Sequence, residues 1–527
     1  MDLILLDGRS LTVGDVVSVA RGGLRVEVSP AAAERVNVSR TVVERALTEG
    51  RAVYGVTTGF GKLSEVTIDP GQVQALQENL IVSHCAGVGQ PLDAEYVRAT
   101  MLLRANALAV GNSGVRLTTL NTLVDMLNAG VHPIVPEKGS LGASGDLAPL
   151  AHLCSVMIGR GEAVYQGRKM DGLSALRAAG IEPVRLEAKE GLALINGTQI
   201  MTAIGCLVAH DACVLLKTAD VAAALTLEAL RGIPDAFDEL IVSARPHAGA
   251  RESAANVRTL TKGSGLTTAP GEKRVQDAYA LRCVPQVHGA SRDAVRHVVS
   301  VLGTEINSAT DNPLIFPATG ETGDGGRPGG AVGGAAGGTI ISGGNFHGQP
   351  VALAMDYLGI AVSEIANISE RRIERMVNPA LSGGLPPFLV VRSGLNSGFM
   401  LVQYTAAALV SENKILASPA SVDSIPSSAN QEDHVSMGTI AARKAREILW
   451  NAACVVAMEL LTAAQAAEFC GPERLGAGTR AAYDLVRSRV PFLEVDRPLT
   501  PDIEAVRDMI RSGAVVEAVE KAAGPMA

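Results

Sequence analysis

The sequence contains few aromatic residues and few charges. Phenylalanine, tryptophan and tyrosine make up 3% of its 527 residues, and charged residues make up 19%. Sheets favour aromatic and β-branched side chains, so the aromatic shortage, together with abundant Ala, Leu and Val, disfavours a β-sandwich or barrel and favours helices. Apolar residues make up 47% of the chain, enough to bury a large core, which excludes intrinsic disorder as the main state.

Basic charge is also scarce, and the cysteines show no metal-binding spacing. The chain has 46 Lys and Arg against 54 Asp and Glu, a net charge of −8, and no concentrated basic stripe, which argues against nucleic-acid binding. The seven cysteines form no CxxC pair, so we expect reduced core thiols and no metal site. The N-terminus lacks a signal-peptide cleavage site, and the most apolar long run, residues 199–216, carries His210 and Asp211. We therefore expect a cytoplasmic protein with no membrane partner.

Helical periodicity dominates beyond about residue 60. The first 60 residues are mixed, with a possible hairpin at Asp7-Gly8. Helices are expected at residues 12–21, 31–48, 96–109, 117–129 and 147–158, and long ones at 198–231, 285–308, 348–377 and 435–469. Residues 452–467 are apolar nearly all round, so this helix must be buried in a large core or against partner subunits. The pattern predicts a mainly all-α long-helix bundle with a small mixed N-terminal portion. We divide it into residues 1–195, 196–480 and 481–527 of one interlocked body.

Two segments are rich in glycine. Residues 319–344 are about half glycine but contain neither a GxxxxGK[ST] pattern nor a strand–GxGxxG–helix context, so a passive loop is expected there. The second segment, GSLGASGDLAPL at 139–150, reads most simply as a turn before a helix, with Ser144 or Asp146 as cap and Pro149 in the first turn. Its Ala143-Ser144-Gly145 triplet also permits a reaction. The Gly145 amide nitrogen, which has no neighbouring Cβ, can approach the Ala143 carbonyl. Ring closure with loss of one water there, and loss of a second water from Ser144, would leave an electrophilic methylidene-imidazolone.

The segment GSLGASGDLAPLAHL resembles the prosthetic-group loop of the histidine and aromatic amino acid ammonia-lyases. Seven further motifs resemble that family and occur in the family's order. They are YGVTTGFG at 54–61, SH at 83–84, LINGT at 194–198, QDAYALR at 276–282, DNP at 311–313, GNFH at 344–347 and NQEDH at 430–434. The resemblance covers residues from about 50 to 440.

The resemblance implies a role for each matching residue. Ala143, Ser144 and Gly145 would form the 4-methylidene-imidazol-5-one group, with no external cofactor. Tyr54 matches the base that removes the β-proton, and Arg282 matches the residue that holds the substrate carboxylate. Tyr279 and Asn196 match the groups that flank the electrophile, Tyr279 being counted with the catalytic residues. Three further matches line the substrate pocket: Gln276, Asn312 and Phe346.

Substrate choice depends on His84 and Glu432. The Ser83-His84 pair is typical of histidine-type enzymes but also occurs in some tyrosine aminomutases, whereas Glu432 is typical of histidine-type lyases, whose tyrosine- and phenylalanine-acting relatives generally carry Gln. A carboxylate can accept a hydrogen bond from an imidazole N–H, while a phenyl ring would leave it unpaired. The resemblance therefore implies elimination of ammonia from L-histidine to give trans-urocanate, in a homotetramer whose sites combine residues of several subunits. A tyrosine or phenylalanine ammonia-lyase or aminomutase, and a non-catalytic helical assembly protein, remain alternatives.

Overall fold

The structure, a computed structural model, is mainly helical. It describes residues 3–51, 53–59, 61, 68–318 and 338–527, and in that part of the chain it contains nineteen α-helices and nine short strands. The predicted all-α class is confirmed. The chain divides into two compact units, residues 1–207, 299–355 and 419–443 in the first and residues 208–298, 356–418 and 444–527 in the second. The division predicted from the sequence, at residues 195 and 480, stays a prediction.

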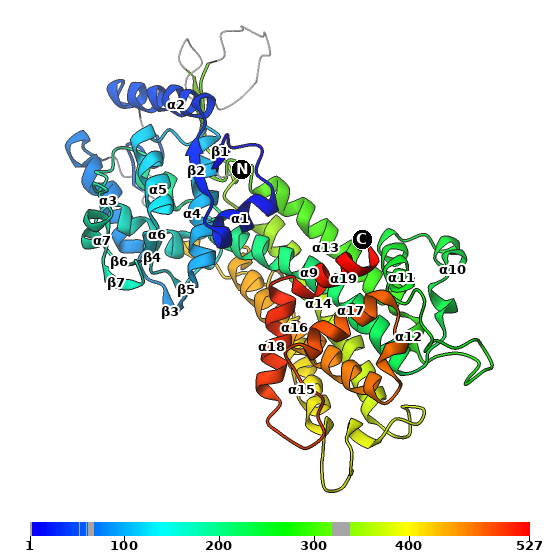
Figure 1. The fold of residues 1–527 in the computed structure, drawn as a ribbon. Helices are drawn as coiled ribbons and strands as arrows, with labels where there is room; N and C mark the ends of the chain where they lie inside the picture. The colour runs from blue at the N-terminus through cyan, green and yellow to red at the C-terminus, as the bar shows by residue number, and fades with distance from the viewer. Residues whose placement is uncertain (1–2, 52, 60, 62–67, 319–337) are drawn as a thin grey trace. The chain divides into compact units, whose positions relative to one another are not determined.

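The first unit begins with a strand–helix–strand arrangement in place of the predicted hairpin. Strand β1 (Leu3–Leu6) pairs in parallel with β2 (Arg25–Val28), and helix α1 (Val13–Gly22) connects them (Figure 1). The hairpin prediction is wrong because Asp7 does not turn the chain back on itself. Its carboxylate accepts hydrogen bonds from the amides of Arg9 and Ser10, at 2.8 and 2.9 Å, and the chain continues to Thr12, which caps α1.

Seven further helices lie wholly in the first unit. They are α2 (Pro30–Thr48), α3 (Val73–His84), α4 (Ala94–Ala109), α5 (Leu117–Ala129), α6 (Leu147–Met157) and α8 (Glu190–Ile195), and the short α7 (Gly172–Ala178) follows α6 in the chain. Helix α4 is buried on almost every side, from Tyr96 to Ala109. A helix of that kind is stabilised by the elements packed around it, here α1, α2 and α5 among others.

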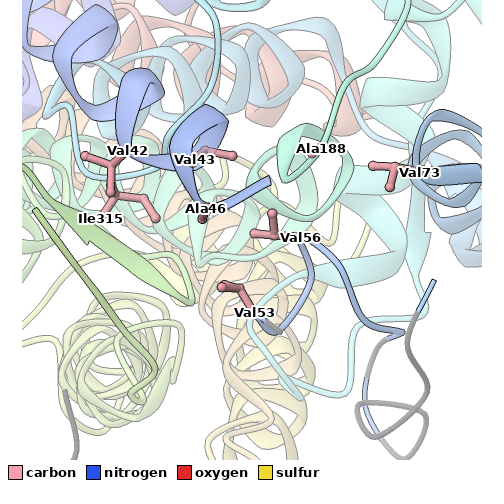
Figure 2. Close-up of a cluster of buried hydrophobic side chains, with 8 residues drawn as sticks. All are labelled: Val42, Val43, Ala46, Val53, Val56, Val73, Ala188 and Ile315. Carbon is pink, nitrogen blue, oxygen red and sulfur yellow. The ribbon is translucent and has the colours of Figure 1, made fainter. Parts of the chain in front are cut away.

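A small apolar cluster holds the segment that contains Tyr54. Val53 and Val56, on either side of Tyr54, are buried with Val42, Val43 and Ala46 of α2 (Figure 2). Val73, Ala188 and Ile315 complete the cluster. Burial of apolar side chains on both sides of Tyr54 fixes the backbone that carries it.

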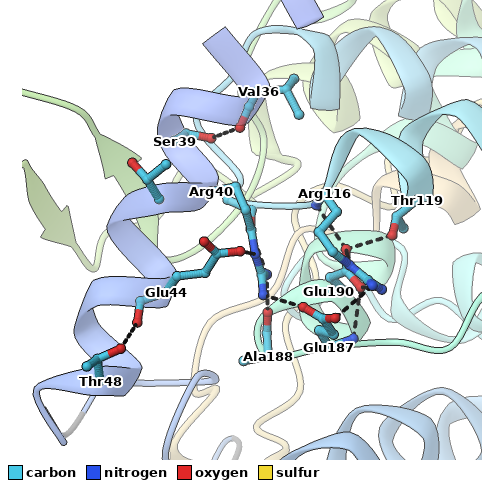
Figure 3. Close-up of polar contacts among 12 residues, drawn as sticks. Val36, Ser39, Arg40, Glu44, Thr48, Arg116, Thr119, Glu187, Ala188 and Glu190 are labelled. Carbon is cyan, nitrogen blue, oxygen red and sulfur yellow. Dashed lines mark hydrogen bonds and ion pairs between the residues drawn. The ribbon is translucent and has the colours of Figure 1, made fainter. Parts of the chain in front are cut away.

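A charged network joins α2, the start of α5 and the start of α8. The buried Arg40 donates to the carbonyl of Ala188 at 2.9 Å and to the Glu187 carboxylate at 2.8 Å (Figure 3). Glu190, at the first position of α8, is also buried and accepts from Arg116 at 2.7 Å and from the Thr119 hydroxyl at 2.6 Å. The network fixes the start of α8, the helix that leads to Asn196.

The strands of the first unit are short. Strand β3 (Val88–Pro91) pairs with β5 (Pro136–Lys138), and β6 (Glu162–Tyr165) pairs with β4 (His132–Pro133) and β7 (Arg168–Asp171). Strands β8 (Leu314–Phe316) and β9 (Thr339–Ile341) are antiparallel. The predicted passive loop at 319–344 therefore contains a strand near its end, and its residues 319–337 lie outside the described residues.

Four long helices follow the predicted bounds closely. They are α9 (Gln199–Ala229), α13 (Val284–Glu305), α14 (Gln349–Val377) and α16 (Gly438–Glu468). Helices α9, α14 and α16 are long and apolar enough to cross a membrane by length and composition. No such helix was expected from the sequence, since its most apolar run carries His210 and Asp211, but one or two charges do not exclude a helix of this kind. Most of each apolar stretch is buried within the protein.

The second unit contains two buried charged groups on these helices. Arg372 pairs with Glu459, which also accepts from Thr226 and Ser369 at 2.8 and 2.6 Å. Asp220 is equally buried; burial opposes its ionisation, but the guanidinium of Arg292 and the His288 ring outweigh that effect and lower its pKa to about 2. The other helices of this unit are α10 (Glu239–Ala244), α11 (Ala248–Leu260), α12 (Tyr279–Arg282), α15 (Met400–Leu416), α17 (Ala477–Arg487), α18 (Thr500–Arg511) and α19 (Ala514–Ala523).

Candidate active site

The Ala143-Ser144-Gly145 turn is held against Gly197, just after α8. Ser144 and Gly145 both have left-handed backbone, with φ of 55° and 79°. The amide of Asp146 donates to the Gly197 carbonyl at 2.7 Å, and the amide of Gly197 donates to the Ser144 carbonyl at 3.3 Å. A Cβ on residue 145 would lie 2.1 Å from the Gly197 oxygen. Only glycine fits at this position, and Ser144 is kept in a conformation that non-glycine residues adopt rarely.

Asp146 caps a helix other than the one it precedes. It occupies the N-cap position of α6, but no side chain makes a capping hydrogen bond there. Its Oδ2 instead accepts from the amides of Ile200 and Met201, in the first turn of α9, at 3.0 and 2.9 Å. Its Oδ1 accepts from the hydroxyls of Ser140, at 2.9 Å, and Thr439. The prediction that Ser144 or Asp146 caps α6 is therefore wrong, whereas Pro149 does lie in the first turn of α6.

One pocket of about 410 Å³ brings together four of the predicted residues, Tyr54, His84, Ser144 and Glu432. The rest of its lining is mainly apolar or glycine: Gly59, Gly61, Ile68, Leu76, Asn79, Leu80, Ser83, Leu147, Leu192 and Ile195. The sequence analysis did not assign Leu76, Asn79 or Leu80 to the site. They lie on the same face of α3 as Ser83 and His84, at helical spacings of three and four residues, and counting back from His84 along that face would have found them.

Each titratable side chain of the pocket has a local partner. The Tyr54 hydroxyl oxygen accepts from the Gly61 amide at 3.1 Å. Burial raises the pKa of Tyr54 above its usual 10.0, and the charge of Glu432 adds to that effect. Burial lowers the pKa of His84, whose Nδ1 lies 3.1 Å from the Ser83 hydroxyl. Glu432 accepts from the Ser427 hydroxyl at 3.0 Å. The pocket thus presents a neutral phenol, a neutral imidazole and a carboxylate beside Ser144.

Asn196 is close to the turn but does not line the pocket. Its carbonyl accepts from the buried Arg104 guanidinium at 2.8 Å, and the same nitrogen donates to Gln199 at 2.8 Å. The Asn196 side chain is buried, and its Oδ1 has no hydrogen-bond partner. A buried amide oxygen without a protein partner is costly, so Asn196 Oδ1 has hydrogen-bonding capacity that the described protein atoms do not use.

Asn312 and Phe346 also lie outside the pocket lining. The side-chain oxygen of Asn312 is already engaged by the Gly343 amide, at 2.7 Å, and by the Ser342 hydroxyl, at 3.1 Å. Asp311, next to it, forms a fully buried ion pair with Lys189 at 2.7 Å. Asn312 thus has two hydrogen-bond partners within its own chain, and its place in the substrate pocket stays a prediction.

Gln276, Tyr279 and Arg282 belong to the second unit and do not line this pocket. Tyr279 is 71% exposed, and the Arg282 guanidinium lies 4.5 Å above its ring centre. The Nε of Arg282 is buried and has no hydrogen-bond partner. Tyr279 and Arg282 thus share α12 and contact each other, but within one chain they are not part of the Tyr54 pocket.

In the described part of the chain, no three His, Cys, Asp or Glu side chains are close enough to hold a metal ion. All seven cysteines are free.

Comparisons with known proteins identify the family of this chain. A sequence model of the aromatic amino acid lyases matches residues 11–488. The chain is 59% identical to a histidine ammonia-lyase of Alkaliphilus oremlandii and 60% identical to one of Caldanaerobacter subterraneus subsp. tengcongensis, with 99% of each chain covered in both cases.

Solved structures give the same result. A histidine ammonia-lyase from Trypanosoma cruzi is 43% identical with a TM-score of 0.89, covering 98% of this chain and 95% of that one. A tyrosine aminomutase from Streptomyces globisporus is 40% identical with a TM-score of 0.91, covering 98% of both chains. The family predicted from the motifs is confirmed, and this chain belongs to the aromatic amino acid lyases.

Proposed function

We propose that this protein is a histidine ammonia-lyase, which eliminates ammonia from L-histidine to give trans-urocanate. One observation carries the proposal: Tyr54, His84, Ser144 and Glu432 line a single pocket. That pocket combines a base, two groups that recognise an imidazole ring, and the central residue of the reactive turn. Relatives 55–60% identical over almost the whole chain, each named histidine ammonia-lyase, support this substrate.

The reaction needs more than a base. The β-proton of an amino acid is barely acidic, and a positioned base supplies only about 10²–10⁴ in rate, below the 10⁶ or more that enzymes typically reach. A 4-methylidene-imidazol-5-one made from Ala143, Ser144 and Gly145 supplies the missing electrophile when it has formed. The turn fits this group because Gly145 has no room for a Cβ, Ser144 lies at the pocket wall, and Asn196 leaves a buried amide oxygen without a partner nearby.

Tyr54 acts as the base. The Gly61 amide donates to its oxygen and thereby stabilises the phenolate, whereas burial and Glu432 favour the neutral phenol. Removal of the substrate's β-proton by Tyr54 is therefore favoured at alkaline pH, where more of Tyr54 is phenolate. A cation that approaches Tyr54 from outside this pocket would favour the phenolate in the same way. Arg282 is the cation we assign to the substrate carboxylate, since a guanidinium can hold a carboxylate through two parallel hydrogen bonds.

His84 and Glu432 hold the imidazole ring. Both can accept a hydrogen bond from a ring N–H, and the apolar side chains of Leu76, Leu80 and Leu192 line the same pocket. A phenyl or phenol ring offers no N–H to these acceptors, so binding it would leave the Glu432 carboxylate with the Ser427 hydroxyl and no hydrogen bond from the substrate ring.

We assign the chain to a cytoplasmic homotetramer in which Gln276, Tyr279 and Arg282 complete the pocket of another subunit. Helix α14 exposes Leu353, Tyr357 and Ile360, spaced by four and three residues along one face. An apolar stripe of this kind on a long helix is typical of a subunit interface. The buried, unpaired Nε of Arg282 also supports a role that one chain does not fulfil.

Subunit complementation tests this arrangement. Tyr54→Phe and Arg282→Met are each expected to abolish histidine turnover. When the two variants are co-expressed and assemble at random, about a quarter of the sites receive both wild-type residues if these come from different subunits. Recovery of that fraction supports shared sites, and no recovery from a mixed tetramer would overturn them.

The function itself is tested by following urocanate formation from L-histidine in the ultraviolet. The wild-type protein is expected to form urocanate and ammonia in equal amounts, and Ser144→Ala is expected to be inactive although folded. Full activity of Ser144→Ala would exclude the electrophile. If neither protein acts on any aromatic amino acid, the chain is a non-catalytic helical assembly protein.

The second candidate is a tyrosine- or phenylalanine-acting lyase or aminomutase. The similarity to the tyrosine aminomutase structure favours it, because that structure matches at a TM-score of 0.91. Incubation with L-tyrosine and L-phenylalanine separates the two, with analysis for both cinnamate-type and β-amino acid products. Turnover of tyrosine without turnover of histidine would replace the first proposal with the second.

A further inference from the structure

In the last turn of α3, the Ser83 hydroxyl lies between the Leu80 carbonyl and the His84 ring. Ser83 Oγ lies 3.1 Å from the Leu80 carbonyl oxygen, to which it donates, and 3.1 Å from Nδ1 of His84. A serine hydroxyl has one hydrogen and accepts through its lone pairs. In the arrangement in which that hydrogen is donated to the Leu80 carbonyl, the hydrogen between Ser83 and His84 comes from the imidazole. His84 is then protonated at Nδ1 and bears its lone pair at Nε2.

The surroundings of His84 favour the neutral ring. Burial disfavours the charged ring and lowers the pKa of His84, while the Leu80 carbonyl stabilises a proton on the imidazole and the nearby Glu432 favours its charged form. Tyr54 and Glu432 line the same pocket and are the other titratable groups that His84 meets there. A neutral ring with Nδ1 protonated can only accept at Nε2.

We propose that Ser83 is a positioning residue which fixes the tautomer of His84, so that Nε2 accepts a hydrogen bond from the ring N–H of the substrate. The inference rests on the proposed function, because it requires a substrate whose ring carries an N–H. Without the Ser83 hydroxyl, the imidazole can exchange to the tautomer protonated at Nε2. That nitrogen would then point a hydrogen at the N–H of the substrate and repel it.

The kinetic test compares three single variants. Ser83→Ala is expected to lower kcat/KM for L-histidine by about 3- to 10-fold, the range for one uncharged hydrogen bond, and to do so mainly through KM. Ser83→Thr keeps the hydroxyl and is expected to retain most of the activity. Ser488→Ala removes a similar hydroxyl, which donates to the Leu485 carbonyl at 2.6 Å at the end of α17, and is expected to leave activity unchanged.

A double-mutant cycle separates positioning from simple structural damage. In a His84→Ala background, Ser83→Ala is expected to have no further effect on kcat/KM, because the group through which it acts is gone. Independent, additive losses in the double variant would overturn the proposal, and so would failure of Ser83→Thr to restore activity when its fold is intact.

A chemical readout reports on the tautomer without turnover. Diethylpyrocarbonate acylates the unprotonated imidazole nitrogen, and its incorporation at His84 can be followed by mass spectrometry of the peptide. We expect His84 to react faster in the wild-type and Ser83→Thr proteins than in Ser83→Ala. Equal rates in all three would refute the role of Ser83. If the wild-type protein fails to consume histidine, the proposed function falls, and the labelling rates still decide the tautomer.

Discussion

Replacing Gly145 by alanine should disrupt the reactive turn far more than its conformation alone implies. Residue 145 has a φ of 79°, where an alanine costs about 1–2 kcal/mol relative to glycine. The added Cβ would also lie 2.1 Å from the Gly197 oxygen and 2.4 Å from its carbonyl carbon. Backbone atoms cannot yield as a flexible side chain does, so the turn and Gly197 must separate.

That separation breaks two buried hydrogen bonds. They join Asp146 to Gly197 at 2.7 Å and Gly197 to Ser144 at 3.3 Å. Each contributes about 0.5–1.5 kcal/mol, so the free energy of unfolding should fall by about 2–5 kcal/mol in total. The displaced turn should also fail to bring the nitrogen of residue 145 to the Ala143 carbonyl, and histidine turnover should be lost.

Gly180→Ala is the matched control. Gly180 has a φ of 72°, but a Cβ there would meet nothing within 4 Å, so only the conformational cost of about 1–2 kcal/mol applies. The stabilities of both variants and the wild type should be compared at one protein concentration by chemical denaturation monitored by circular dichroism. Ultraviolet difference spectra against Ser144→Ala then report whether the electrophile has formed, and histidine turnover reports activity. The steric argument is refuted if Gly145→Ala matches Gly180→Ala in denaturation midpoint and keeps its activity.

A pH profile and two substitutions give three further tests. Because burial raises the pKa of Tyr54 above 10.0, its phenolate accumulates only at high pH, and kcat/KM should rise about tenfold per pH unit through the alkaline range below that pKa; a flat profile would contradict Tyr54 as the base. Glu432→Gln should lower kcat/KM for histidine by about 10- to 100-fold in steady-state assays, since a charged acceptor is lost, and unchanged kinetics would exclude that contact. Lys189→Met leaves Asp311 buried without its partner and should cost about 3–5 kcal/mol in denaturation experiments. Lys169→Met breaks an exposed pair with little effect, and equal losses in the two lysine variants would contradict the argument.

The helices could be predicted because their apolar periodicity is strong and long. The helix predicted at residues 348–377 is α14 (Gln349–Val377), and the one predicted at 435–469 is α16 (Gly438–Glu468). In α14 burial repeats with the helical period over many turns, whereas the second half of α16 is buried on nearly every side, as its all-round apolar sequence predicts. The N-terminal segment lacks such a signal, and the carboxylate of Asp7 directed the chain into a strand–helix–strand arrangement that local turn chemistry alone did not distinguish from a hairpin.

The pocket was predictable only in part. Tyr54, His84, Ser144 and Glu432 were found by their motifs and do share a cavity. Its apolar wall has no chemical signal, because residues such as Leu76 read as ordinary core positions until the helix face of His84 is known. Arg282 could be assigned a role from its motif, but its motif does not say which copy of the chain it serves.

Asp146 caps α9 and not α6, and this explains why the predicted cap of α6 is wrong although it lies beside the Ala143-Ser144-Gly145 triplet. A residue before a helix is expected to cap that helix, since its side chain can reach the amides of the first turn. The Asp146 carboxylate instead accepts hydrogen bonds from the first-turn amides of α9 and from the hydroxyls of Ser140 and Thr439. Hydrogen bonds to residues 54 and 293 positions away in the sequence therefore decide the orientation of the Asp146 side chain. The local sequence pattern around Asp146 contains no sign of either contact.

This arrangement also has a chemical consequence. Because Asp146 caps α9, the N-terminus of α6 has no side-chain cap, and it begins two residues after Gly145. The uncapped first turn carries the positive end of the helix dipole, which favours negative charge developing on the neighbouring turn. A carboxylate placed on α6 would have cancelled that effect. The long-range contacts of Asp146 thus do two things at once: they hold the reactive turn in place, and they leave the helix end beside it free to stabilise charge.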